Sequence, residues 1–223
     1  MRTPRRVRAI RAGLLAVVFA VVSAGCTPAT SAPPTPISTQ LEALTVIARP
    51  PADDTYRRAY FGKAWTDTDG SNCRQRADVL YRDVDRSRPF TTRRAGRCTH
   101  EMVSGTWQDP YTGEVRTFSN LRDPVQAQQL PIDHVVALAV FWRYGASSWT
   151  DQQRLVAAND LDNLVPTTAH VNASKGGKDA ASWRPPKRGQ CEFAHRYITI
   201  KARYQLAVDT SEKAALQEML TTC

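Results

Sequence analysis

Apolar side chains recur at the three- and four-residue spacing of amphipathic helices in several parts of the chain. Ala77, Leu80 and Val84 show this spacing most regularly. Thr150 followed three residues later by Gln153 is a capping-box signal for the start of another helix. These patterns predict helices over residues 41–47, 77–84, 139–144, 150–158, 168–175, 193–204 and 209–223.

Other apolar segments are short and bounded by turn residues, which is typical of strands. Met102 to Trp107 and Glu114 to Phe118 are predicted as two strands, joined by the turn-forming run Asp109-Pro110-Tyr111-Thr112-Gly113. Ile132 to Leu138 and Leu164-Val165 are predicted as shorter strand segments. The basic stretch 86–97 between the second helix and the first strand is predicted as a turn-rich loop. Helices and strands together predict an α+β fold.

The first residues have the organisation of an export signal. Arginines precede an apolar stretch from Ala12 to Val22 that is too short for a comfortable membrane span. Ser23-Ala24-Gly25-Cys26 follows and resembles a bacterial lipoprotein cleavage box, which implies lipidation of Cys26; ordinary secretion with cleavage near Ala24 is the alternative. We therefore expect a signal peptide over 1–26, a flexible stalk rich in Pro, Ser and Thr over 27–40, and a folded domain over 41–223.

Composition supports this organisation. The chain carries a net charge of +9, and removing the five arginines of the signal segment leaves +4. A moderately basic domain suits a polyanionic partner such as nucleic acid. If Cys26 is lipidated and anchors the protein to the membrane, four cysteines remain, which allow three pairings. We favour Cys73–Cys98 and Cys191–Cys223, because each pair brackets one contiguous region, and disulfides fit an oxidising compartment.

One constellation of polar residues points to a specific chemistry. It consists of Asp133-His134, then Asn163, then Asn172-x-x-Lys175. Phosphodiester hydrolysis needs a base for the attacking water and positive charge at the phosphate. Histidine is the natural base near neutral pH, and carboxylate and amide oxygens are ligands that Mg²⁺ prefers. The sequence therefore predicts a metal-dependent nuclease site, provided that these groups meet in space.

The position of the Asp-His pair sets a geometric condition. Adjacent residues of a regular strand point to opposite faces, so Asp133 and His134 need a strand end or a bulge to act together. Asn172 and Lys175 lie three residues apart on the predicted helix and share a face. Asn163 precedes a strand, where its side chain could fix the loop that carries His134.

The order Asp-His, Asn-Leu, Asn-x-x-Lys resembles the HNH endonucleases of the ββα-metal, or His-Me finger, superfamily. Blocks outside this core also resemble the exported actinobacterial branch of that family, and the likeness covers roughly the whole predicted domain. These blocks are Phe61-Gly62-x-Ala64-Trp65-x-Asp67-x-Asp69-Gly70, Gly105-x-Trp107-x-Asp109-Pro110-Tyr111-Thr112-Gly113, Asn172-x-Ser174-Lys175-Gly176, Trp183-x-Pro185-Pro186 and Lys201-x-x-Tyr204.

The resemblance implies a role for each residue. His134 would be the general base, and Asp133 and Asn172 would hold a divalent metal, Mg²⁺ or alternatively Mn²⁺. Asn163 would orient His134 and its loop, and Lys175 would support the phosphate or the site. It also implies a ββα-metal core over about 130–186, preceded by a β-hairpin and helix region and followed by C-terminal helices.

Two functions of different classes follow from the sequence. The first is an exported endonuclease, a membrane lipoprotein or an extracellular protein, that hydrolyses DNA through backbone contacts, with RNA as an open second substrate. The second is a catalytically inactive envelope lipoprotein that keeps the HNH fold for binding. The two differ in whether Asp133 and Asn172 can reach one ion.

Overall fold

The computed structural model describes residues 36–50 and 55–223. The predicted signal peptide, the predicted lipidation site Cys26 and residues 27–35 of the predicted stalk lie outside the described residues. Among the residues that are described, no helix combines the length and the apolar character needed to cross a membrane.

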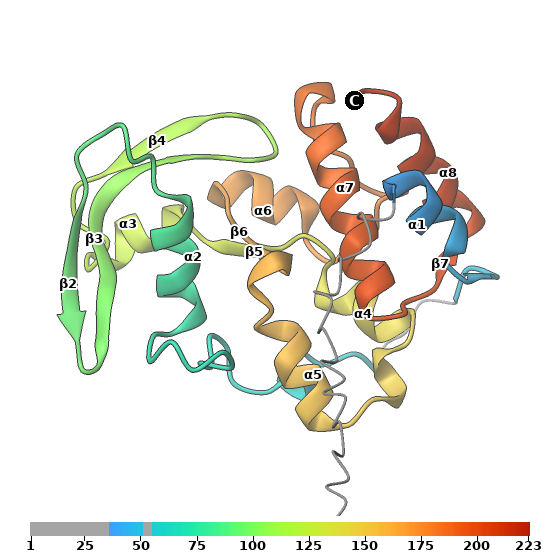
Figure 1. Cartoon of the computed structure of the whole chain (residues 1–223), viewed down its shortest axis with the longest axis horizontal. Coiled ribbons are helices and arrows are strands. Elements are labelled where there is room, and N and C mark those ends of the chain that lie inside the picture. Colours follow the sequence, from blue (N-terminus) through green and yellow to red (C-terminus); the bar gives the residue numbers. More distant parts are fainter. Residues whose placement is uncertain (1–35, 51–54) are drawn as a thin grey trace, which may run out of the picture. The chain divides into compact units, whose positions relative to one another are not determined.

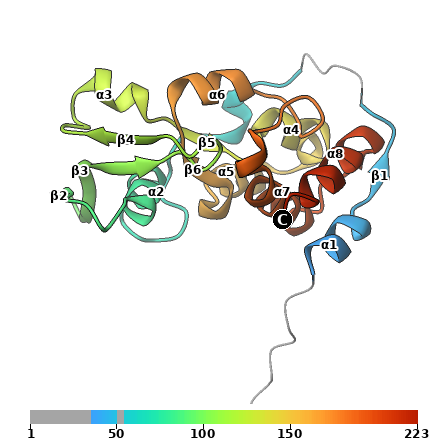
Figure 2. The ribbon, with the colours of Figure 1, turned by 90° about the horizontal axis from the view of Figure 1, so that it is seen from above.

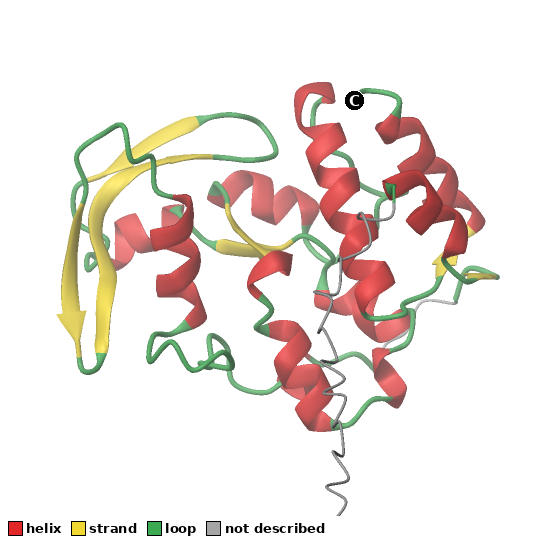
Figure 3. Ribbon diagram, in the orientation of Figure 1, coloured by secondary structure: helices red, strands yellow, loops and turns green. Residues whose placement is uncertain are grey.

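The described part of the chain is a mixed α+β fold, as predicted (Figure 3). Its α-helices are α1 (Ile37–Ala43), α2 (Gln75–Asp83), α3 (Pro124–Gln129), α4 (Leu138–Arg143), α5 (Asp151–Ala158), α6 (Ala169–Lys175), α7 (Lys187–Arg203) and α8 (Thr210–Leu220). Short 3-10 helices are η1 (Arg58–Phe61), η2 (Ala146–Ser148) and η3 (Leu161–Asn163). The strands are β1 (Val46–Ile47), β2 (Thr91–Ala95), β3 (Cys98–Gln108), β4 (Val115–Phe118), β5 (Ile132–His134), β6 (Leu164–Pro166) and β7 (Val208–Asp209).

The first helix differs from its prediction. It starts at Ile37, so the end of the predicted stalk is helical, and it ends at Ala43 rather than continuing to Ile47. Leu41 and Leu44 are buried as the helical spacing implies. Val46 and Ile47 instead form β1, which pairs in parallel with β7. β-branched residues favour this extended edge position over a further helical turn.

An antiparallel sheet of order β2-β3-β4 packs beside α2 (Figure 1). β3 contains the predicted strand 102–107, β4 covers the predicted strand 114–118 except for Glu114, and the predicted turn lies between them. β2 was expected to be a loop, and that expectation is wrong: Thr91–Ala95 pairs with β3. Four of its five residues are exposed and the fifth is only partly buried, so the strand has no apolar alternation that a sequence pattern could detect.

The element that carries the Asp-His pair lies in the middle of the fold. β5 pairs antiparallel with β6, with Asp133 opposite Val165 and His134 opposite Leu164. The segment between the two strands contains α4 and α5, and α6 follows β6 directly. In both Figure 1 and Figure 2 this pair of strands lies between the three-stranded sheet and α7.

The C-terminal helices complete the main core as their apolar stripes predict. Phe193, Tyr197 and Ile200 of α7 are buried, as are Leu216 and Met219 of α8. The predicted starts of two helices are also confirmed. The capping box at the start of α5 forms, and Asp209 caps α8 by accepting a hydrogen bond from the N–H of Glu212. Both favoured disulfides, Cys73–Cys98 and Cys191–Cys223, are present.

Candidate active site

Asp133 and His134, the last two residues of β5, both line a pocket of about 210 Å³. Tyr56 and Arg58, before and at the start of η1, form another part of its wall, and Gly176-Gly177 after α6 completes it. The two side chains have separate sets of partners, as strand alternation requires. They share one pocket because the strand ends at His134, so the geometric condition is met by a strand end.

The His134 imidazole is held as a neutral ring in a defined orientation. Its exposed fraction is 9%, and its Nε2 lies 2.8 Å from the carbonyl oxygen of Ala158, the last residue of α5. A carbonyl oxygen only accepts hydrogen bonds, so Nε2 carries the proton and Nδ1 keeps its lone pair. Burial and the nearby Arg58 lower the pKa of His134 to about 3, the Ala158 carbonyl opposes them, and Lys175 adds to the lowering. The ring is therefore uncharged at physiological pH.

The indole of Trp65 lies against the same imidazole. The two rings are nearly parallel, at 14°, with centroids 6.2 Å apart. Trp65 has φ of +60°, a left-handed conformation that is unusual for a bulky aromatic residue. Such a backbone persists only where its surroundings hold it, and these positions concentrate at functional sites.

Asp133 is buried and paired. Its Oδ2 accepts a hydrogen bond of 2.7 Å from the hydroxyl of Tyr111 and lies 3.0 Å from Nζ of Lys175, and Nζ is also 3.3 Å from Oδ1. Burial raises the pKa of Asp133, and Lys175 and Tyr111 oppose that rise. The positive charge of Lys175 therefore favours the ionised form of this buried carboxylate and offsets part of the cost of burying it.

Lys175 and Asn163 also hold the backbone around the pair. The Lys175 ammonium donates to the carbonyl of His134 at 2.7 Å and is fully buried. Asn163 is equally buried; its Oδ1 accepts from the N–H of Val136 at 2.8 Å, and its Nδ2 donates to the carbonyl of the same residue at 3.1 Å. Both side chains therefore fix the backbone at His134 and in the segment that follows it.

Asn172 makes no side-chain hydrogen bond to this cluster within the described residues. It is partly exposed on α6, one turn before Lys175. Within residues 36–50 and 55–223, its side chain makes no hydrogen bond with Asp133 or His134. The structure thus brings Asp133, His134 and Lys175 together with Asn163 behind them, and among the described residues no hydrogen bond joins the Asn172 side chain to Asp133 or His134.

The turn that carries Tyr111 is fixed by a second carboxylate. Asp109 is buried and accepts from the N–H groups of Tyr111 and Thr112 within the turn. Its other oxygen accepts from the hydroxyl of Thr167 and the N–H of Thr168 at the start of α6. Asp109 therefore joins the turn that supplies Tyr111 to the helix that supplies Lys175.

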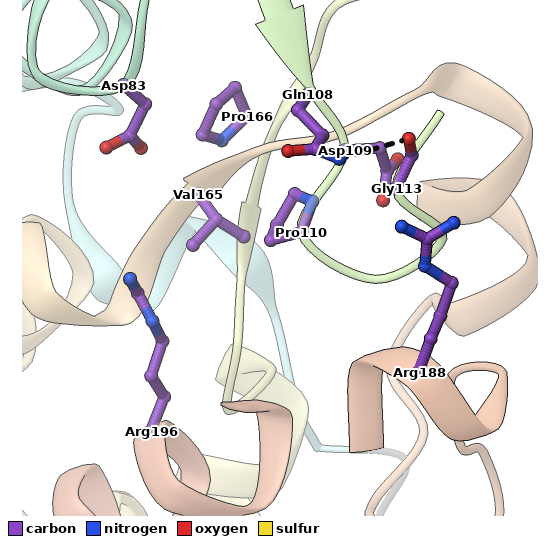
Figure 4. Close-up of a pocket in the computed structure, with 9 residues that line it drawn as sticks. All are labelled: Asp83, Gln108, Asp109, Pro110, Gly113, Val165, Pro166, Arg188 and Arg196. Atoms are coloured by element: carbon purple, nitrogen blue, oxygen red, sulfur yellow. Dashed lines mark hydrogen bonds between the residues drawn. The ribbon is translucent and has the colours of Figure 1, made fainter. Parts of the chain in front are cut away.

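A different pocket, of about 370 Å³, adjoins this turn (Figure 4). Arg188 of α7 points toward Gly113 in it, and a Cβ atom at Gly113 would come within 2.3 Å of that guanidinium. The pocket is lined by neither Asp133 nor His134. It lies where the turn meets α7 and is distinct from the candidate site.

The donor atoms near Asp133 fit a hard divalent cation. A carboxylate has about four lone-pair positions, and Asp133 uses only part of this capacity on Tyr111 and Lys175. The amide of Asn172 adds an oxygen, and Mg²⁺ commonly keeps several waters beside one or two protein ligands. In the described part of the chain, His, Cys, Asp and Glu cluster in threes elsewhere, at Cys73, Cys98 and His100 and at Cys191, His195 and Cys223. The sulfurs of both clusters are in disulfides.

Sequence reasoning missed Tyr111, Arg58 and the carbonyl of Ala158. Tyr111 belongs to a block whose turn was predicted, but no sequence signal shows that its hydroxyl reaches Asp133. Arg58 lies in a segment without periodic pattern. A backbone carbonyl has no signature in sequence at all, because every residue carries one.

Comparisons with known proteins agree with a nuclease-like chain. A family model described as the C-terminal domain of GmrSD restriction endonucleases matches residues 75–219. An uncharacterized secreted protein of Arthroderma benhamiae (strain ATCC MYA-4681 / CBS 112371) is 38% identical over 217 residues, covering 92% of this chain and 98% of that protein. Because this relative is fungal, the actinobacterial branch stays a prediction. No solved structure matches the chain.

Proposed function

The chain belongs to the family of the GmrSD restriction endonuclease C-terminal domain, and from that premise we propose that it is an HNH-type, metal-dependent endonuclease that hydrolyses the phosphodiester bonds of DNA. RNA remains open as a second substrate. The observation that carries the proposal is the state of His134: a neutral imidazole in a pocket, with Nε2–H held by a carbonyl and the Nδ1 lone pair uncommitted.

His134 acts as the general base. Its Nδ1 accepts a proton from the water that attacks the phosphorus. The Nε2–H···O contact with Ala158 fixes the tautomer, as an oriented base requires, and Asn163 holds the loop that follows the ring. Because burial keeps the pKa near 3, the base stays unprotonated across the whole physiological range.

Asp133 and Asn172 hold the divalent cation, Mg²⁺ or Mn²⁺. When bound, the cation supplies positive charge that neutralises the phosphate. Lys175 positions Asp133 and the His134 backbone rather than contacting the phosphate, because its ammonium is buried and already bonded to both.

Arg58 takes the phosphate-binding role. It is exposed and lines the same pocket as His134. Among the described residues its side chain has no hydrogen-bonding or ion-pairing partner. A guanidinium with unused donors binds phosphate in a bidentate manner.

Replacing His134 by Ala tests the assignment. We expect plasmid nicking to fall by about 10²–10⁴-fold, the usual contribution of a general base, with the circular dichroism spectrum unchanged. His170→Ala is the matched control, because His170 lies exposed on α6 and should leave the rate unchanged. Undiminished cleavage by the His134 variant would sink the proposal.

One observation favours the alternative of an inactive binding protein. Both Asp133 oxygens already have protein partners, and in the described residues no hydrogen bond joins Asn172 to Asp133. A calorimetric titration with Mg²⁺ or Mn²⁺ separates the two functions. Saturable binding that Asp133→Ala abolishes supports the nuclease, and metal-independent DNA binding without cleavage supports the alternative.

We also propose that the protein is exported. The support is its two disulfides and the description of its fungal relative as secreted. Lipidation of Cys26 is the finer part of the proposal. Mass spectrometry of the mature N-terminus tests it: a diacylglyceryl cysteine is expected, and cleavage near Ala24 without lipid would contradict it.

A further inference from the structure

A larger pocket than the one around His134 is lined in part by Trp65. It measures about 570 Å³ and is bounded by α2, β2, β3 and the segment that precedes α2. Its apolar part is formed by Leu80, Met102 and Leu121, together with Trp65. No function described so far uses this pocket.

The pocket carries excess positive charge. Arg74, Arg76 and Arg93 line it, and Glu101, which pairs with Arg93 at 2.7 Å, is its acidic residue. Arg76 donates only to the backbone carbonyls of residues 127 and 130, so its charge is not neutralised by them. Burial lowers the pKa of Arg76, and the like charge of Arg74 adds to this effect. Two cations that repel each other at one pocket indicate an anionic occupant.

Arg74 is available to that occupant. It is exposed, and in the described ranges its side chain makes no hydrogen bond or ion pair. Arg94 offers a contrast on the neighbouring strand: it is also exposed but does not line the pocket, although Arg93 before it and Ala95 after it do.

Trp65 connects this pocket to the candidate active site. Its indole lines the pocket and is also nearly parallel to the His134 ring, with centroids 6.2 Å apart. A base stacked on the indole face away from His134 would add about 3.4 Å and would lie about three nucleotide rises from the imidazole. A nucleotide placed on Trp65 would therefore lie within a few nucleotides of a phosphate placed at His134.

We propose that this pocket binds one nucleotide of a single-stranded nucleic acid, with its unpaired base stacked on Trp65 and its backbone phosphate at Arg74 and Arg76. Stacking needs an exposed base face, which a paired duplex does not offer unless a base is flipped out. The left-handed backbone of Trp65 holds the indole where it serves both the base and His134. This inference deepens the proposed nuclease function and rests on it, because it makes a single strand the preferred substrate.

Binding to the full chain in the presence of a chelator tests the proposal without cleavage. Fluorescence anisotropy would compare a labelled decathymidylate with an abasic decamer that has the same phosphates and no bases. We expect the abasic strand to bind about five- to 150-fold more weakly, the effect of losing one stacked base. Equal affinities would overturn the proposal, and so would tighter binding of a duplex of the same length.

Variants locate the site. Trp65→Ala should bind the decathymidylate no better than the wild type binds the abasic strand, and Trp65→Phe, which retains a stacking ring, should stay within a few-fold of the wild type. Arg74→Ala should weaken binding and flatten its salt dependence by about one phosphate contact. Arg94→Ala, the matched control, should change neither. Equal effects of the two arginine variants would overturn the placement.

The two proposals fail separately. Cleavage of DNA with binding that ignores the bases would refute the nucleotide pocket and leave the nuclease standing. Base-dependent binding without cleavage under any divalent metal would refute the nuclease and leave the binding pocket.

Discussion

Lys175 and Asp133 form a buried ion pair, and the effect of removing it on the free energy of unfolding can be predicted. Nζ and Oδ2 are 3.0 Å apart, and the side chains are 1% and 7% exposed. At an effective dielectric constant of about 20, two unit charges at this distance attract by roughly 5 kcal/mol. Removing both charges from water costs several kcal/mol in return, so the net contribution of the intact pair is small.

Breaking the pair on one side has a large effect. Lys175→Met leaves the Asp133 carboxylate buried without its cation and the His134 carbonyl without its donor. Asp133→Asn leaves the ammonium buried without its anion. We expect each single variant to lose about 3–5 kcal/mol in free energy of unfolding. The double variant lacks both charges and should lose far less than the sum of the two.

Urea unfolding at neutral pH with chelator, followed by tryptophan fluorescence, measures the four members of this cycle. Arg93 and Glu101 give a matched control, because they are 2.7 Å apart but 42% and 38% exposed. Their coupling should not exceed about 1 kcal/mol. A Lys175–Asp133 coupling no larger than that of the exposed pair would refute the reasoning that burial makes this contact decisive.

Three further predictions concern the surroundings of the site. Gly189→Ala should lower the free energy of unfolding by about 1–3 kcal/mol, because a Cβ atom there would lie 2.3 Å from the Tyr111 carbonyl oxygen. Thermal melts measure this, and an unchanged melting temperature would contradict the close approach of α7 to the turn. Folding lowers the pKa of His134 from 6.5 to about 3, so between these two pH values the imidazole binds a proton in the unfolded chain but not in the folded one. The free energy of unfolding should therefore fall as the pH is lowered through this range, by up to about 1.4 kcal/mol per pH unit. His134→Asn should remove that part of the slope in chelated urea titrations between pH 6.5 and 4, and identical slopes would argue against a buried neutral ring. Asn163→Ala should lower the free energy of unfolding by about 1–3 kcal/mol for each Val136 backbone group left unpaired. It should also lower kcat of cleavage more than it changes KM. A change in KM alone would contradict a role of Asn163 in orienting the base.

Much of the fold was predictable because its signals are local. Helices with a regular apolar stripe or a capping box, such as α2 and α5, form where the pattern places them. β2 was missed because its residues are largely exposed and its pairing with β3 is its only structural reason to be extended. The end of α1 was misplaced because the helical spacing of Ile47 competes with strand pairing to β7, which is far away in sequence.

The same distinction between local signals and contacts with distant segments applies to the candidate site. The residue types and their order pointed to Asp133, His134, Asn163, Asn172 and Lys175, and among the described residues hydrogen bonds link all of these except Asn172 to the segment around His134. The partners that set their chemistry come from distant segments, as with Tyr111 on Asp133 and Ala158 on the imidazole. Such contacts depend on tertiary packing, which a motif does not encode.

Helix α5 links two parts of the pocket that are remote in sequence. Its last carbonyl, at Ala158, receives the His134 Nε2–H, and Arg154 one turn earlier donates from Nε to the carbonyl of Tyr60 at 3.0 Å in the 3-10 helix that begins at Arg58. A residue inserted between Arg154 and Ala158 would rotate one anchor by about 100° and shift it by about 1.5 Å relative to the other. α5 therefore sets the distance between the His134 imidazole and the Arg58 guanidinium. Insertions and deletions within this turn should be excluded from active members of the family, whereas substitutions on its exposed face should be tolerated.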